Sequence, residues 1–576
     1  MRRLDTLLAL LAVGIIFTLG AGLALSAPVR PPPERTIPTP PPRPTEQLLT
    51  EGTIGPVTVL DPQFAVTPAE RSISALMFRG LTRLGPDGEI LPDLASDWEV
   101  DAAGLVWTFH IRPAERWHDG RLISADDVIT TVETLTDPRY DGPAAGGWSG
   151  VTAERVDRFT VRLHLPGAIS TFLPQTTAPL VPAHLLGGVS VEDRPTSTFA
   201  RRPVGNGPFA IETVRARFVV LRRVGPPPGG PSPTYGLDPV TGAPESTPRA
   251  APDPRPLLER YRLRLYDDAA ALVEALRSGE VQMAAGLEPA DLGPIARERD
   301  IDALRYPGTQ ALMLVPNLRS STAPLFDAAV RRALSLAVDR GRIGAEVFSG
   351  AATPATTLFS PASPLYDAAA SGEPRFDPDA AQAGLVAAGW TETPDGWRMP
   401  DSDEDVLIEL VVRDAPDSVE DVLLAEQIAE DWRELGLQVD VLPVPPDELI
   451  DQRLRAGLFD VALLDVELGL DPDLYPLFVS GEAVVGGSNI GGYQSSLMDR
   501  LLAEARQVAD PATRAERARA LQAALSREMP VIPIAFPDHL VLLREEVAGP
   551  VPRPVRVAEE RYWDVLTWRL ALRPDE

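Results

Sequence analysis

The hydrophobic pattern of the chain has two periods. Apolar and polar residues alternate at 160–165 and at 261–266, as they do in half-buried strands. Two other stretches carry apolar residues at helical spacing, with charged or polar residues between them: Val422, Ala425, Ile428, Trp432 and Leu435 in one, and Val330, Ala333, Leu334, Ala337 and Val338 in the other. This mixture predicts an α/β protein in which the apolar stripes are core faces.

The amino terminus has a different pattern. Arg2 and Arg3 precede an uncharged, largely apolar run from about residue 7 to residue 27, which is typical of an export signal or a membrane anchor. A run of about twenty residues is long enough to span a bilayer, and Pro28 should hinder cleavage after Ala27. We therefore expect 1–27 to be a retained transmembrane anchor, with a cleaved signal segment as the alternative. The proline-rich residues 28–48 are expected to form a stiff linker, with the rest of the chain outside the membrane.

Composition limits the classes of function. At 576 residues the chain is too long for one hydrophobic core, and its net charge of −28 argues against nucleic acid as a partner. The absence of cysteine excludes disulfides, thiolate metal sites, cysteine nucleophiles and a cysteine-linked lipid anchor. We expect no metal site and no cofactor, because the five histidines are scattered without ligand spacing: His110, His118, His164, His184 and His539.

A series of short motifs follows in order along most of the chain. They are Leu60-Asp61-Pro62, 76–81 (LMFRGL), 90–98 (ILPDLASDW), 107–112 (WTFHIR), Trp117-His118-Asp119-Gly120, 124–128 (SADDV), 203–209 (PVGNGPF), 278–281 (SGEV), 330–340 (VRRALSLAVDR), Ala388-Gly389-Trp390, 489–493 (NIGGY) and 529–533 (MPVIP). Taken alone, each has a plain structural interpretation. The segment at 117–120, for example, is a turn in which glycine supplies backbone freedom and tryptophan an anchor.

In this order the motifs resemble the family 5 solute-binding proteins of ABC importers, which include the oligopeptide- and dipeptide-binding proteins. The resemblance covers roughly residues 50–550. It implies a two-lobed clamp like the periplasmic binding proteins (type II, cluster C-like), with an extra domain on the first lobe. The expected limits are lobe I at 49–85, 205–310 and 536–576, the extra domain at 86–204, lobe II at 311–535, and a flexible, Pro- and Gly-rich insertion within lobe I at 224–256.

The same resemblance implies a function. A small solute or peptide is expected to bind between the lobes, which close by hinge motion and then dock on an ABC permease in the membrane. We expect an extracytoplasmic monomer that catalyses no reaction. The sequence agrees, because it carries neither a Gly-x-Ser-x-Gly elbow nor a His-Glu-x-x-His pair.

Ligand contacts are expected from three segments of the chain. They are the loop Phe64, Ala65, Val66 and Thr67, the segment Thr357, Leu358, Phe359 and Ser360, and the acidic loop with Asp465, Glu467, Leu468 and Asp471. Peptide-binding members carry a tryptophan and an ammonium-binding aspartate before an acidic-Pro pair. Alignment on Asp471-Pro472 puts Asp465 and Leu468 at those two places, with Glu467 next door.

These differences from the peptide-binding members leave alternatives open. Adjacent strand residues face opposite ways, so a one-place shift is not neutral, and binding of a free amino terminus is in doubt. The acidic cluster fits either a cationic ligand group or a solvated strand end. A membrane-tethered sensor or scaffold that keeps the clamp fold without import is the alternative function.

Overall fold

The computed structural model describes residues 47–571, apart from 145–146, 226–231, 235–248, 252–256, 293–294, 296–297, 321–322, 373–374, 416–418 and 508–509. The predicted anchor at 1–27 and nearly all of the linker lie outside these residues. Much of the predicted insertion at 224–256 lies outside them as well, although two short strands of it are described, β10 (Ser232–Thr234) and β11 (Arg249–Ala251). Within the described part of the chain, no helix has the length and apolar character needed to cross a membrane.

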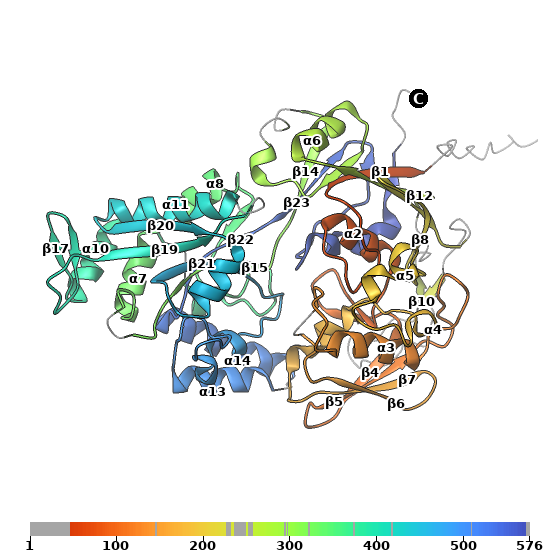
Figure 1. Ribbon diagram of the computed structural model, residues 1–576, viewed down its shortest axis with the longest axis horizontal. Coiled ribbons are helices and arrows are strands. Elements are labelled where there is room, and N and C mark those ends of the chain that lie inside the picture. Colours follow the sequence, from red (N-terminus) through yellow and green to blue (C-terminus); the bar gives the residue numbers. More distant parts are fainter. Residues whose placement is uncertain are drawn as a thin grey trace, which may run out of the picture. The chain divides into compact units, whose positions relative to one another are not determined.

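One mixed sheet has seven strands and collects segments from distant parts of the chain (Figure 1). A βαβ unit forms its centre, because helix α6 (Ala269–Ser278) connects two strands that both pair in parallel with β1. The helix begins at Asp268, which accepts from the Ala271 amide, and ends at Gly279 with φ +76°. The strand order is β14 (Ile301–Tyr306), β23 (His539–Arg544), β13 (Met283–Ala285), β1 (Leu48–Ile54), β12 (Arg260–Tyr266), β9 (Phe218–Arg223) and β8 (Phe209–Arg215).

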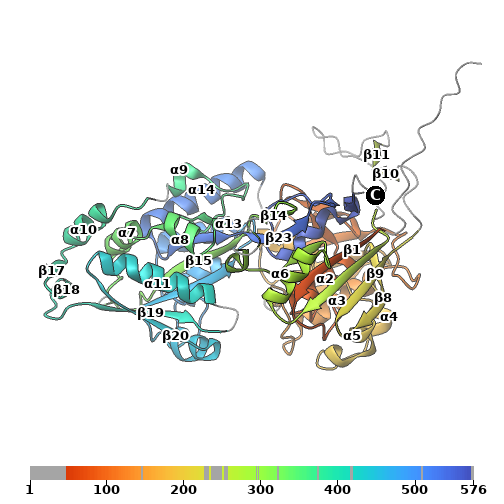
Figure 2. The same cartoon turned by 90° about the horizontal axis from the view of Figure 1, so that it is seen from above.

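A second mixed sheet has six strands, all drawn from residues 352–354, 532–537, 310–316 and 407–467. Its order is β16 (Ala352–Pro354), β22 (Ile532–Pro537), β15 (Gln310–Pro316), β21 (Val461–Glu467), β19 (Leu407–Arg413) and β20 (Gln438–Val444). Helix α11 (Val419–Glu434) connects the parallel strands β19 and β20 and packs on both of them (Figure 2). Its apolar stripe, with Ala425, Ile428 and Trp432 fully buried, is the predicted one.

Two further groups of elements complete the described chain. A four-stranded antiparallel sheet consists of β4 (Ala95–Val100), β5 (Val106–Ile111), β7 (Thr160–His164) and β6 (Thr152–Arg155), with helix α3 (Ala125–Thr136) beside it. Beside the six-stranded sheet, helices α7 (Ala328–Leu336), α13 (Ser496–Ala505) and α14 (Pro511–Glu528) bury apolar residues. The strands predicted at 160–165 and 261–266 are thus confirmed as β7 and β12.

The chain passes twice between the two large sheets. Strand β14 leads into β15, and β22 leads into β23, while Tyr306 pairs with His539 across the two connections. The connections run so close together that a Cβ atom on Gly308 would lie 2.1 Å from the carbonyl oxygen of Pro537. Residues 47–576 form one compact unit, and its division into lobes at 204/205, 310/311 and 535/536 stays a prediction.

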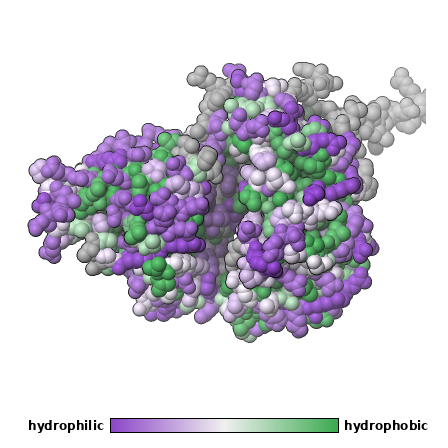
Figure 3. Space-filling view, viewed as in Figure 1, coloured by the Kyte–Doolittle hydropathy of each residue, from purple (hydrophilic) through white to green (hydrophobic). Residues whose placement is uncertain are grey.

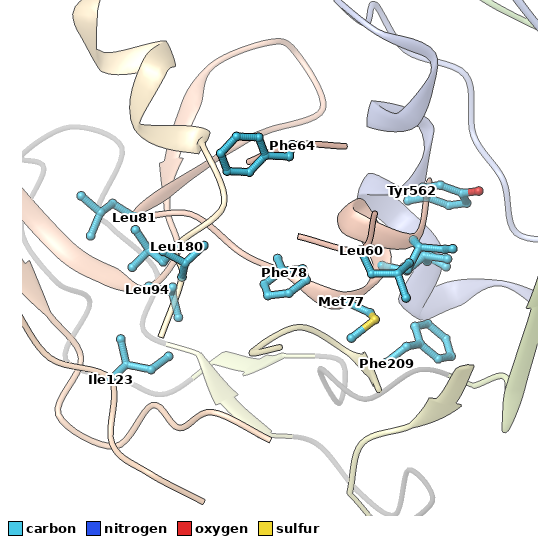
Figure 4. Close-up of a cluster of buried hydrophobic side chains, with 14 of the residues drawn as sticks. Leu60, Phe64, Met77, Phe78, Leu81, Leu94, Ile123, Leu180, Phe209 and Tyr562 are labelled. Carbon is cyan, nitrogen blue, oxygen red and sulfur yellow. The ribbon is translucent and has the colours of Figure 1, made fainter. Parts of the chain in front are cut away.

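The seven- and four-stranded sheets share one apolar core. Tryptophan and phenylalanine of the 107–112 motif enter it, and so does Trp117, which is 2% exposed at the start of a turn whose Gly120 has φ +89°. The structural interpretation of that motif is therefore confirmed. A part of this core holds side chains from the loop after β1, from the end of helix α2 (Pro68–Met77), from β8 and from the carboxyl-terminal segment (Figure 4): Leu60, Phe64, Met77, Phe78, Phe209 and Tyr562.

Candidate functional site

The acidic residue of the first motif is part of the core. Asp61 is fully buried, and Arg194 donates to both of its oxygens, from Nε at 2.7 Å and from Nη2 at 3.0 Å. Burial raises the pKa of Asp61, and the contacts with Arg194 oppose that rise. Gln63 and Thr134 accept two further guanidinium hydrogen bonds at 2.9 Å. This ion pair is closed on all sides and offers nothing to a ligand.

The predicted contact loop after this pair is rigidly held. Phe64 and Ala65 are buried, whereas Val66 is 64% exposed and Thr67 caps helix α2 (Pro68–Met77). The Glu70 carboxylate accepts from the amides of both Val66 and Thr67, at 3.0 and 3.1 Å. Of the four predicted residues, Val66 and Thr67 are therefore the two that reach the surface.

The second predicted segment is almost completely buried. Thr357, Leu358, Phe359 and Ser360 are 1–3% exposed, and the two apolar side chains belong to a cluster with helices α13 and α14. Thr357 lines a cavity of about 10 Å³, the size of one water molecule, and its hydroxyl has no hydrogen-bond partner among the described residues. In this conformation the segment is part of the core and has little surface for a ligand.

Strand β21 divides the third predicted segment between two faces. Asp465 and Glu467 lie two residues apart, so they share one face of the strand, which carries Val461 and Leu463 deeper in the core. The opposite face, including Leu468 beyond the strand end, packs against the cluster with α13 and α14. The one-place shift noticed in the sequence thus places Glu467 and Leu468 on different sides of the chain.

Glu467 is the last residue of β21 and lies opposite Gln310, where the connection from β14 enters β15. Its Oε1 accepts from the Thr309 hydroxyl at 2.5 Å and from the Gly469 amide at 2.7 Å. Although much of the residue is accessible to solvent, burial of its carboxyl group raises the pKa to about 7. Thr309 and Gly469 lower it, and so does the nearby Arg556 guanidinium, which is itself paired with Glu560 at 2.6 Å.

The other two carboxylates of the loop differ from each other. Asp465 is exposed and accepts a hydrogen bond from the Gln310 side-chain amide. Asp471 instead forms an ion pair with Arg514, whose Nε lies 2.7 Å from Oδ2. The predicted acidic cluster is therefore reduced to two carboxylates, Asp465 and Glu467, that lack a cation within bonding distance among the described residues.

Several residues of this site escaped the sequence analysis. Thr309 and Gln310 lie at the crossover into β15, and Gln310 pairs with Glu467 across the sheet. Arg556 comes from the carboxyl-terminal segment and also donates to Thr177 at 3.1 Å. None stands in a recognisable motif, and only the strand register brings them to Glu467. No hydrogen bond or ion pair between described residues links 64–67 or 357–360 to 465–471.

Figure 3 shows where polar residues gather on one face of the molecule. On the face drawn in Figure 3, a hollow lined by hydrophilic residues runs beside the part of the chain that carries the six-stranded sheet. Within the described residues, no group of three or more histidine, aspartate or glutamate side chains is arranged to hold a metal ion. The strand end therefore offers hydrogen-bond acceptors and negative charge, from Asp465 and Glu467.

Known proteins match this chain over most of its length. The family model for bacterial extracellular solute-binding proteins, family 5 Middle, matches residues 89–481. Heme-binding protein A of Haemophilus influenzae is 26% identical over 81% of this chain and 82% of its own length, and di/tripeptide-binding protein 1 of Pseudomonas aeruginosa is 24% identical over 82% and 85%. The solved structure of HbpA2 from Haemophilus parasuis superimposes with a TM-score of 0.73 at 22% identity, covering 91% of this chain and all of that one.

Proposed function

The chain belongs to family 5 of the bacterial extracellular solute-binding proteins, the extracytoplasmic binding components of ABC importers, and on this premise we propose that its ligand is a small solute with a cationic group. The observation that carries the proposal is the carboxyl pair at the end of β21. Glu467 accepts two hydrogen bonds on Oε1, whereas Oε2 has no partner among the described residues and is the oxygen for a ligand N–H.

The geometry favours Glu467 over its neighbours for this role. Asp471 already has a cation, and Leu468 packs on the opposite side of the chain. Asp465, on the same face as Glu467, is the second acceptor. The amino terminus of a short peptide has the required chemistry, and di/tripeptide-binding proteins are among the relatives of this chain. Other solutes with an amine or guanidinium fit equally.

The contacts on the other side of the ligand are proposed from Val66 and Thr67. A ligand that touches them and the strand end together stabilises a closed state, because only that state offers both sets of contacts. We propose that the buried segment at 357–360 holds the shape of the site. A membrane permease is the proposed acceptor of the solute, the protein acts as a monomer, and residues 1–27 anchor it to the membrane.

Native mass spectrometry of protein purified from its own host should reveal a co-purifying solute. Calorimetry with that solute then tests the site. Replacing Glu467 with Gln should leave folding intact and weaken binding by about 1.5–3 kcal/mol, the range for a hydrogen bond to a charged group. Asp465→Asn should also weaken binding, because the exposed Asp465 is the proposed second acceptor. Unchanged affinity in both variants would remove the carboxyl pair from the site.

A further inference from the structure

A second polar site lies at the other end of the same sheet. Strand β15 begins at Gln310, beside Glu467, and ends at Pro316, opposite Val461. At about 3.4 Å per residue its two ends are roughly 20 Å apart. Arg319 follows the far end, where three loops meet, and so lies away from the carboxyl pair of the proposed solute site.

The three loops around Arg319 are fastened by asparagine side chains. Asn317 Nδ2 donates to the carbonyls of Gly457 and Phe459, both at 2.9 Å, and the Leu318 amide donates to Gly491 at 2.7 Å. Asn489 holds the third loop in the same way, with hydrogen bonds to the carbonyls of Val479 and Tyr493. These contacts make a preformed scaffold, in contrast to an arginine on a free surface loop.

Two glycines form a slot for the arginine side chain. Gly457 and Gly492 have φ +69° and +71°, a region that favours glycine. A Cβ atom on Gly492 would lie 2.4 Å from Cγ of Arg319, and one on Gly457 would lie 3.2 Å from Nη1. A side chain at either position would therefore displace the arginine or distort the loop.

Among the described residues, the guanidinium in this slot has no ion-pair partner. Its Nε and Nη1 are shielded from solvent and have no hydrogen-bond partner among the described residues, where no other arginine leaves two shielded nitrogens without an acceptor. Burial lowers the pKa of Arg319, and no neighbouring acid opposes that shift. The arginines of helices α13 and α14 differ, since Arg506 and Arg514 each bind an aspartate. In a chain of net charge −28, such an isolated cation is unexpected.

We propose that Arg319, held between Gly457 and Gly492, binds a carboxylate or similar oxyanion from outside the chain. The residue is half-buried, and Nη2 is not among its shielded nitrogens, so Nη2 is the donor an incoming oxygen meets first. Such an anion supplies a negative charge to the partly desolvated guanidinium of Arg319, and the slot between the two glycines already holds that guanidinium in place. Leu458 beside the slot is 62% exposed, which makes an acidic side chain on a partner protein one source of the carboxylate and a free anion the other.

Thermal unfolding of the full-length protein tests this site. Sodium acetate and sodium phosphate are titrated against sodium chloride at constant ionic strength, and tri-glutamate serves as a probe for a protein carboxylate. The wild type should gain about 2 °C at saturation relative to chloride. Arg319→Gln should lose this gain. Arg500→Gln, which changes an exposed arginine of helix α13, should keep it.

A second measurement separates binding from a merely structural role. In chloride alone, Arg319→Gln should unfold at the same temperature as the wild type or higher, because it removes a shielded charge that lacks a partner. An arginine that only packs would give a lower temperature. Gains with acetate and phosphate identify a free anion, and a gain with tri-glutamate alone identifies an acidic side chain. Equal responses of wild type and Arg319→Gln to all three probes would overturn the proposal.

Discussion

Two acidic segments of this chain look alike in sequence and differ in structure. Asp61 stands before a proline in the first motif, and Asp465 to Asp471 precede a proline in the last predicted ligand loop. Asp61 is fully buried and held by two hydrogen bonds from Arg194. Glu467 is accessible, accepts from uncharged donors, and keeps one oxygen without a partner among the described residues. Asp61, which is paired with Arg194, therefore belongs to the core. Glu467, which has no ion-pair partner among the described residues, is the acid available to a solute.

The comparison also separates two uses of burial. Around Asp61, burial is compensated by a cation, and the result is a rigid start for the loop that follows. At Glu467, burial of the carboxyl group is opposed by a hydroxyl, an amide and the nearby Arg556, which is itself paired with Glu560, and the pKa still rises to about 7. A group whose charge is poorly compensated gains most from a cationic partner. The incompletely compensated charge of Glu467 therefore supports the proposed solute site better than the number of acidic residues in the loop does.

The largest expected effect comes from breaking the buried ion pair between Asp61 and Arg194. Arg194→Met leaves Asp61 buried without its cation, and the free energy of unfolding should fall by about 3–5 kcal/mol in urea denaturation. The double variant Asp61→Asn, Arg194→Met should recover much of this loss, because no charge remains buried. A single variant as stable as the wild type would contradict the structural role of the pair.

The second effect concerns binding and not folding. Glu467→Gln should lower the affinity for the co-purifying solute by about 1.5–3 kcal/mol, while its urea midpoint stays close to that of the wild type. Calorimetry in buffers of different ionisation enthalpy should also show proton release when the wild type binds near pH 6–7, since a ligand cation lowers the pKa of Glu467. Binding without proton release would show that the ligand brings no positive charge to this carboxyl.

A smaller effect is the pH dependence of stability. The pKa of Glu467 is raised from an ordinary value near 4.5 to about 7 in the folded protein, so the folded state holds this proton more tightly than the unfolded state. Stability should therefore fall as pH rises from about 4.5 to 7 and change no further above that range. Because the residue is accessible to solvent, we expect a loss of about 1 kcal/mol, well below the unscreened value. Glu467→Gln should remove this part of the slope.

Much of this architecture was readable from the sequence, for physical reasons. The strands at 160–165 and 261–266 and the helical stripe with Ala425, Ile428 and Trp432 are confirmed, because each buries one face and its periodicity records that. The turn at Gly120 is confirmed because only a few residue types tolerate its backbone conformation. The order of the motifs predicted membership of the family 5 solute-binding proteins, and the family model confirms it.

The site was predictable only in part. The sequence placed Asp465, Glu467 and Asp471 together but gave no sign that Arg514, more than forty positions away in the chain, binds Asp471. Burial of 357–360 was also missed, since a segment without clear periodicity does not reveal which side it presents. Thr309, Gln310 and Arg556 act through register and tertiary packing, which no local pattern encodes.

The smallest expected effect distinguishes the two carboxylates of one loop. Asp471 and Arg514 form a partly buried ion pair that solvent still reaches, and Arg514 also donates to the Ala505 carbonyl. Asp471→Asn should therefore cost about 1 kcal/mol or less in unfolding free energy, and the cost should shrink at high salt. Its affinity for the solute should equal that of the wild type, because the carboxylate is already occupied. If Asp471→Asn weakened binding as much as Glu467→Gln, the solute would reach past the strand end and compete with Arg514, and the site would extend along the whole loop.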